Sequence, residues 1–392
     1  MLTVPFLEDI IKKWIKKKSF GDPVDRLNHF ITASILGFFA IMVSAKQYIG
    51  QPIQCMVPKE FSSGWEKYAA DYCFIQNTFY ISFNETIPEE YEDRRKAEIG
   101  YYQWVPIFLS LQAVLFFIPN WIWKSLYSQS GIDLNTIITD GMALRGTGPN
   151  EREENSIKLK EYISDCLGIN DIKRNFRIGC FKLEKNYGSY ITTLYLFIKL
   201  LYVLNVIGQF LLLNNFLGDY YTMWGLKAIK YTLYGKEWQT SNVFPRVTLC
   251  DFDVRALADV HRFTVQCVLK INMFNEKVYL FIWFWFLFVG IVTIVNFIYC
   301  CNSFISLTHR HSSVKYLLQH LMNTKNPREF DKAVRHFTYE GLKPDGYLIL
   351  RFLEGNAGAI ITKDITHKLF QDYLITYMDD YMKDSSLDIV SS

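Results

Sequence analysis

The sequence predicts an all-α membrane protein: a four-transmembrane-helix bundle with a small disulfide-linked α/β extracellular layer and a helical cytosolic domain. Four apolar stretches, 29–48, 105–123, 190–213 and 278–299, each have about the length that crosses a bilayer, roughly 20 residues. Charge differs between the segments that join them, and four cysteines gather in two of those segments. A soluble core with the same 50% hydrophobic content would interrupt its apolar runs sooner.

Charge bias gives the orientation of these spans. Residues 1–28 hold six Lys and Arg against four Asp and Glu, whereas residues 49–104 hold five against nine. Basic residues remain on the cytosolic side, so the N-terminus is expected in the cytosol. Four spans return the C-terminus there. The loops 49–104 and 214–277 are then extracellular, and 124–189 and 300–392 are cytosolic.

The extracellular loops carry four of the chain's eight cysteines. Cys55 and Cys73 lie in the first loop, and Cys250 and Cys267 lie in the second. An oxidising compartment favours disulfides, and four cysteines allow three pairings. Asn84 begins the chain's one Asn-x-Ser/Thr sequence, a possible N-glycosylation site. We expect a helix over 59–72 and a strand from Cys73 to Ser82.

Two features suggest contact with water or headgroups. The segment 1–28 predicts a basic amphipathic helix, which either lies on anionic lipid or folds into a channel mouth, and the sequence by itself favours the lipid surface. Its basic positions are Lys12, Lys13, Lys16 and Lys17. Small side chains follow one face of the first span at Ala33, Gly37, Ala40 and Ser44. Such a face serves either tight helix packing or a pore wall.

The other spans have distinctive residues of their own. Pro119 lies inside the second span, where it removes a hydrogen bond and kinks the helix. Polar residues follow one side of the third span at Lys199, Tyr202, Asn205 and Gln209, and should face neighbouring helices or a lumen. The aromatic start of the fourth span predicts an interfacial belt on the lipid side.

The cytosolic segments contain no catalytic motif. Neither HExxH, GxSxG nor a Walker A sequence occurs, so we expect no enzyme, no cofactor and no metal site. Residues 300–392 predict several short helices, and Arg145 to Ser156 predicts a mobile linker. Cys300 and Cys301 stand at the cytosolic membrane boundary, where they are either S-acylated or remain free thiols. A net charge of +3 gives no reason to expect nucleic-acid binding.

One run of residues resembles a known family. The sequence YYQWVP, formed by Tyr101, Tyr102, Gln103, Trp104, Val105 and Pro106, is similar to the signature of innexins, the invertebrate gap-junction proteins. The runs at 245–252, 266–269, 271–277 and 280–285 resemble the family as well. Two cysteines per outer loop also match, whereas connexins carry three, tetraspanins concentrate theirs in the second loop and claudins in the first.

Membership would imply a plasma-membrane ring of subunits, eight by analogy, around a pore for ions and small metabolites. Such a ring, a hemichannel, docks to one on the neighbouring cell. Other innexins can be subunits of the same ring, and membrane lipids surround it. In the family the first helix lines the pore and the N-terminal helix forms a funnel, which reverses the preference for the lipid surface. The resemblance also implies the disulfides Cys55–Cys267 and Cys73–Cys250.

Two alternatives remain at this point. A glycan on Asn84 would obstruct docking, so an undocked large-pore hemichannel is one. A four-span adhesion or scaffold protein that does not conduct is the other.

Overall fold

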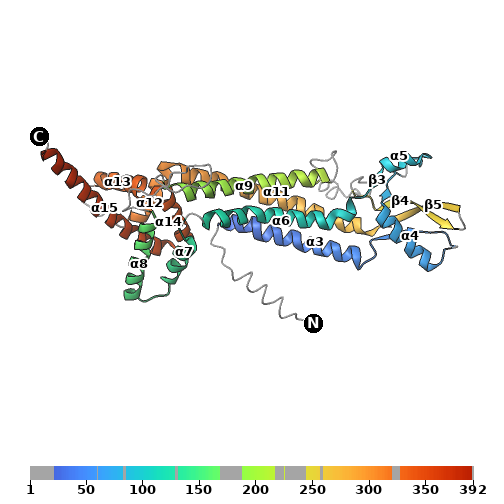
Figure 1. The fold of residues 1–392 in the computed structure, drawn as a ribbon, viewed down its shortest axis with the longest axis horizontal. Coiled ribbons are helices and arrows are strands. Elements are labelled where there is room, and N and C mark those ends of the chain that lie inside the picture. Colours follow the sequence, from blue (N-terminus) through green and yellow to red (C-terminus); the bar gives the residue numbers. More distant parts are fainter. Residues whose placement is uncertain are drawn as a thin grey trace, which may run out of the picture. The chain divides into compact units, whose positions relative to one another are not determined.

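Four long apolar helices dominate the structure, a computed structural model that describes residues 22–59, 61–82, 85–128, 131–167, 188–216, 225, 244–256, 259–319 and 327–390, with side chains to 375 (Figure 1). All four have the length and composition to cross a membrane. They are the first span Pro23–Tyr48, α6 (Tyr101–Tyr127), α9 (Tyr190–Phe216) and α11 (Lys270–Ile305). The predicted four-span architecture is confirmed.

The first span contains an irregular segment. It starts as α2 (Pro23–Arg26), continues as the π-helical η1 (Leu27–Thr32) and ends as α3 (Ala33–Tyr48). Pro23 occupies the first helical position, where its missing N–H costs nothing. The π-helical segment is a local change of helical pitch, of a kind that is frequent at functional sites.

The helices are longer than the apolar stretches that predicted them. The fourth helix begins at Lys270 and ends at Ile305, because polar residues at both ends continue the helical hydrogen bonding outside the apolar region. The second helix runs without a break through Pro119. Whether this proline bends it stays a prediction.

The described chain divides into two compact units. The sheet unit comprises the described parts of 27–118 and 202–293, and the helical unit comprises those of 1–26, 119–201 and 294–392. Each has its own apolar core. In the sheet unit, buried residues of all four membrane helices share one core, exemplified by Leu36, Leu109, Val206 and Trp283.

A five-stranded antiparallel sheet forms the rest of the sheet unit. Its order is β1-β5-β4-β2-β3, and the long hairpin of β4 and β5 is its centre. The strands are β1 (Ile53–Met56), β2 (Thr78–Phe79), β3 (Glu98–Ile99), β4 (Val247–Ala256) and β5 (Asp259–Leu269). Helix α4 (Ser63–Gln76) packs against β1 and β4, and α5 (Tyr91–Lys96) precedes β3. The layer is mixed α and β, as expected.

One prediction in this layer is wrong. Cys73 lies in α4, which continues to Gln76, and the strand that was expected from Cys73 to Ser82 is only Thr78–Phe79. The helix ends at Asn77, whose φ of 82° is in the left-handed region that terminates helices. The helical face of Tyr68, Tyr72 and Cys73 therefore extends one turn further than predicted.

The helical unit contains, beside parts of α6, α9 and α11, further helices of six to 32 residues. They are α7 (Leu134–Ala143), α8 (Pro149–Leu167), α12 (Leu307–Leu318), α13 (Pro327–His336), the π-helical η5 (Phe337–Leu342), α14 (Lys343–Ala357) and α15 (Ala359–Val390). The predicted helical domain at 300–392 is therefore present. The predicted linker from Arg145 to Ser156 is wrong over its last eight residues, because Pro149 and the residues after it form the first turns of α8.

Candidate functional site

The sheet brings the four loop cysteines together as two disulfides. Cys55 of β1 stands opposite Cys267 of β5, and a disulfide joins this cross-strand pair. The second disulfide joins Cys73 of α4 to Cys250 of β4. Each bridge therefore connects the segment before α6 to the segment before α11. This pairing is the one that the family resemblance implied.

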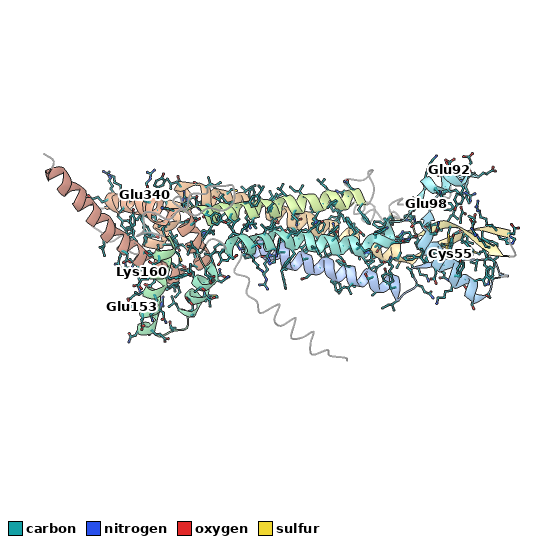
Figure 2. The ribbon with its side chains drawn as sticks, viewed as in Figure 1. Cys55, Glu92, Glu98, Glu153, Lys160 and Glu340 are labelled. Carbon is teal, nitrogen blue, oxygen red and sulfur yellow. A yellow bond between two sulfur atoms is a disulfide. The ribbon has the colours of Figure 1, made fainter. Side chains whose placement is uncertain are left out.

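The two bridges are adjacent and buried. The sulfur atoms of Cys55, Cys73 and Cys267 lie within 4.8 Å of one another, and Figure 2 shows Cys55 among the side chains of the strands. These sulfurs are all bonded to other sulfurs, so they offer no thiolate to a metal ion. The cluster instead supplies a covalent core to a layer in which two of the strands are only two residues long.

An ion pair and a cation–π contact tie α5 to the β4–β5 hairpin. The guanidinium of Arg94 donates to the carboxylate of Asp251, with a nitrogen–oxygen distance of 3.0 Å, and Thr264 of β5 donates to the same carboxylate. Two ladder positions outward, Arg262 of β5 pairs with Asp253 of β4 and stands over the ring of Tyr91 on α5. The hairpin is thus held to the first loop by charge as well as by sulfur.

The YYQWVP signature forms the junction between this layer and α6. The amide of Gln103 donates to the carbonyls of Phe74 and Ile75 at 2.6 and 3.0 Å and to the side chain of Asn77 at 3.0 Å. It thereby satisfies the terminal carbonyls of α4, which have no partner within that helix. Tyr102 packs its ring on Phe74. Pro106 is the sixth residue of α6, beyond the first turn, so its missing N–H removes the helical hydrogen bond to the carbonyl of Tyr102. The side-chain amide of Gln47 donates to that carbonyl at 3.4 Å.

The small-residue face of the first span is only partly covered within one chain. Ala40 is buried, and Ala33, Gly37 and Ser44 are half-buried. A Cβ atom added at Gly37 would meet nothing within 4 Å. This face is therefore open to lipid, water or a second copy of the chain. The four N-terminal lysines lie outside the described residues.

The polar side of the third span is buried in the chain. Lys199 is 2% exposed, and its ammonium group lies 2.7 Å from a carboxylate oxygen of Asp22 and 2.8 Å from one of Asp25. Burial acts to raise the pKa of Asp22, but the ammonium of Lys199 and a hydrogen bond from Asn296 hold that pKa below its ordinary value. Three separate stretches of the helical unit meet at this cluster.

The polar residues of α9 from Tyr202 onward belong to the sheet unit. The hydroxyl of Tyr202 lies 3.4 Å from the Nδ1 atom of His29 on η1, and Gln209 is buried. The polar side of α9 thus packs against protein, which is the first of the two alternatives that the sequence left open.

Comparison with known proteins agrees with this arrangement. The family profile of innexins matches residues 21–373. Innexin-3 of Caenorhabditis elegans is 48% identical over 373 residues, which is 95% of this chain and 88% of that protein. Innexin unc-9 of the same organism is 36% identical over 357 residues, covering 90% of this chain and 92% of its own length.

The chain belongs to the innexin family. Innexins are the subunits of gap-junction channels, so this innexin is a channel subunit that passes ions and small metabolites between adjacent cells. The family consists of oligomeric membrane channels rather than enzymes.

Several predicted site residues of this innexin remain predictions. Asn84 lies outside the described residues, so its glycosylation rests on the sequence. Cys300 is buried and Cys301 is half-buried, and neither is in a disulfide. Of the two, only Cys301 offers partial exposure for S-acylation.

Two structural features had weak sequence signals. Asp345, at the start of α14, accepts hydrogen bonds from the backbone N–H groups of Ile191 and Thr192, and so caps the N-terminus of α9. Its own N–H donates to the carbonyl of Gly188. Asp22 and Asp25, the partners of Lys199, could have been suspected because carboxylates beside an apolar span need a cation.

Proposed function

We propose that this innexin forms a ring of eight subunits in the plasma membrane, with both termini in the cytosol, and that the ring docks to a hemichannel on the neighbouring cell. The single observation that carries the proposal is the layer in which two disulfides crosslink both loops. A docking rim must hold its shape against a partner, and crosslinked strands lose little conformational entropy on binding.

The pore in this proposal is lined by the first span. Its small-residue face is incompletely covered by the rest of the chain, and Gly37 has open space beside it. Closing a ring of subunits would place this face toward the axis or against the next subunit. The disulfide layer and the four helices supply what every subunit of such a ring needs, namely a membrane wall and a rigid outer rim.

Paired-cell recording tests the proposal. Cells that express only this chain and lack channels of their own are brought into contact, and junctional current and dye transfer are measured. We expect both. The Cys73→Ser/Cys250→Ser variant should reach the surface less efficiently or lose junctional current, while Cys166→Ser, which changes a cysteine outside both disulfides, should behave as the wild type.

The alternatives give different results in the same cells. Current across the membrane of single cells without junctional current would support an undocked hemichannel, and removal of Asn84 by Asn84→Gln would then restore junctional current if a glycan is the obstacle. Contact plaques with no current in either configuration would favour an adhesion protein. Current that requires co-expression would mean that another innexin shares the ring.

The N-terminal lysines set the expected ion preference. Lys12, Lys13, Lys16 and Lys17, repeated in every subunit, would make the cytosolic mouth electropositive and favour anions. Neutralising all four to Gln should shift the reversal potential toward cations in a salt gradient. An unchanged reversal potential would show that these lysines lie away from the permeation path.

A further inference from the structure

The cluster of Lys199, Asp22 and Asp25 is the most strongly buried charge network among the described residues of the helical unit. Lys199 of α9 is 2% exposed and lies against two carboxylates. The amide of Asn296 on α11 donates to Asp22 at 2.8 Å. The ring of Tyr195, one turn before Lys199, lies under the ammonium with 5.1 Å between the nitrogen and the ring centroid.

This cluster is a poor source of stability. Two carboxylates face one ammonium, and each charge has lost most of its water. Replacing a buried ion pair by well-packed hydrophobic residues of similar volume is often neutral or stabilising. The attested use of such pairs is to fix one register of packing among several apolar alternatives. In a membrane no hydrophobic driving force holds apolar helix faces together, so close packing and polar contacts between helices determine how they associate.

The cluster lies at the start of the first span, so this is the helix whose packing it would fix. Asp22 immediately precedes the first span, and Asp25 lies in its first turn, α2. The π-helical η1 follows directly. A π-helical turn contains an extra residue, which rotates the following part of the helix by about 100° relative to a regular α-helix. The side chains that α3 turns toward a given direction therefore depend on the position of α2 and on the presence of η1.

Further hydrogen bonds hold η1 within the sheet unit. The amide of Asn28 donates to Thr293 at 2.9 Å, and the indole of Trp285 donates to the hydroxyl of Thr32 at 3.0 Å. Both partners lie on α11. The start of the first span is therefore held by specific polar contacts over about three turns.

We propose that Lys199 is a positioning residue of the channel: through Asp22 and Asp25 it fixes the starting point and rotation of the first span, and hence which side chains of α3 face the pore. This rests on the proposed function, in which the first span lines the pore. Lys199 itself does not contact the permeating ions.

A neutral variant separates positioning from stability. In Asp22→Asn/Asp25→Asn/Lys199→Met the three charges are removed together, so no buried charge is left without a partner. We expect this variant to assemble with a melting temperature close to that of the wild type, but to lose the single main conductance level of the channel. Lys199→Arg, which keeps the charge, should retain that level. Lys199→Met alone leaves two carboxylates without their cation and should reduce the yield of folded oligomer.

A labelling measurement tests the rotation without requiring current. Cysteines are introduced one at a time at Gly37, Phe38 and Ile41, and the rate of modification by a water-soluble thiol reagent is read at each position by peptide mass spectrometry. We expect the order of the three rates to differ between the wild-type and the neutral backgrounds.

Several outcomes would overturn the inference. The same order of rates with the same conductance level in both backgrounds would show that the ion pairs do not position the span. Failure of the neutral variant to assemble, while Lys199→Arg assembles normally, would assign the cluster to stability. Absence of current from the wild type contradicts the proposed function instead, and the labelling rates then still decide whether Lys199 sets the rotation.

Discussion

The two disulfides make a quantitative prediction because they are nested. They join residues that are 212 and 177 positions apart in the sequence, and the difference of 35 positions is the size of the ring that the bridges enclose together. When the Cys73–Cys250 bridge is removed and the other is kept, the unfolded chain regains only the freedom of this ring. The chain-entropy relation gives about 4 kcal/mol for a loop of that size.

Removing the remaining bridge as well should cost more than removing the first. The chain then regains the freedom of the long loop, for which the same relation gives about 5 kcal/mol. The effects of the bridges are thus expected to be non-additive in a defined direction. The reason is topological, since each bridge already shortens the loop that the other one closes.

Native-state hydrogen exchange of the purified protein measures this. In Cys73→Ala/Cys250→Ala the amides of β4 and β5 should exchange about 10³-fold faster, because each 1.4 kcal/mol of opening free energy corresponds to about a factor of ten. Cys166→Ser, in α8 of the helical unit, should leave these rates unchanged. Acceleration of the hairpin amides by less than about tenfold would refute the loop argument.

Two further predictions concern the helical unit, and melting temperature with circular dichroism checks both. Gly141→Ala should lower the stability of the folded protein by about 1–3 kcal/mol, because the new Cβ would overlap the side chain of Leu353. Gly355→Ala, where the new Cβ has open space, should raise it by about 0.5–1 kcal/mol. Equal effects of the two substitutions would contradict the packing around Gly141. Asp133→Ala should cost about 1 kcal/mol because it removes the N-terminal cap of α7. Hydrogen bonds from Thr136 hold the pKa of Asp133 below its ordinary value. The stabilisation by the ionised cap should therefore be fully present above about pH 4 and be lost as the pH falls through the lowered pKa. If Asp133→Ala still lowered the stability in strong acid, the ionised cap would be ruled out.

The apolar spans were predictable because their signal is local. Each run satisfies its own backbone hydrogen bonds as a helix, so length and composition suffice. The sheet is different: β2 and β3 are two residues long and exist because they pair with each other and with β4. A strand of that length has no periodicity to read, which is why the segment after Cys73 was assigned wrongly.

The fourth span shows a second limit. Its aromatic start was expected on the lipid side, but Tyr279, Trp283 and Phe286 are buried within the chain, and only Phe281 of this group is substantially exposed. An aromatic ring is equally apolar toward lipid and toward another helix, so composition cannot say which face is covered by protein. Burial at positions 279, 283 and 286 follows the helical repeat and marks the packed face.

Lys199 illustrates a third limit. The polar stripe of α9 is visible in the sequence, and so are the two aspartates. Asp22 is 177 positions away from Lys199, however, and Asp25 is 174 positions away. No local pattern connects residues so far apart. The same holds for the cap that Asp345 places on α9, 153 positions away from Thr192.

The most direct test of the central claim is a single-particle image of the purified, membrane-extracted protein. A subunit with four membrane helices and one crosslinked rim should appear as a closed ring of eight copies with a hole along its axis, and pairs of rings should meet rim to rim. Particles that remain single chains, or rings without a central hole, would contradict a channel built in this way.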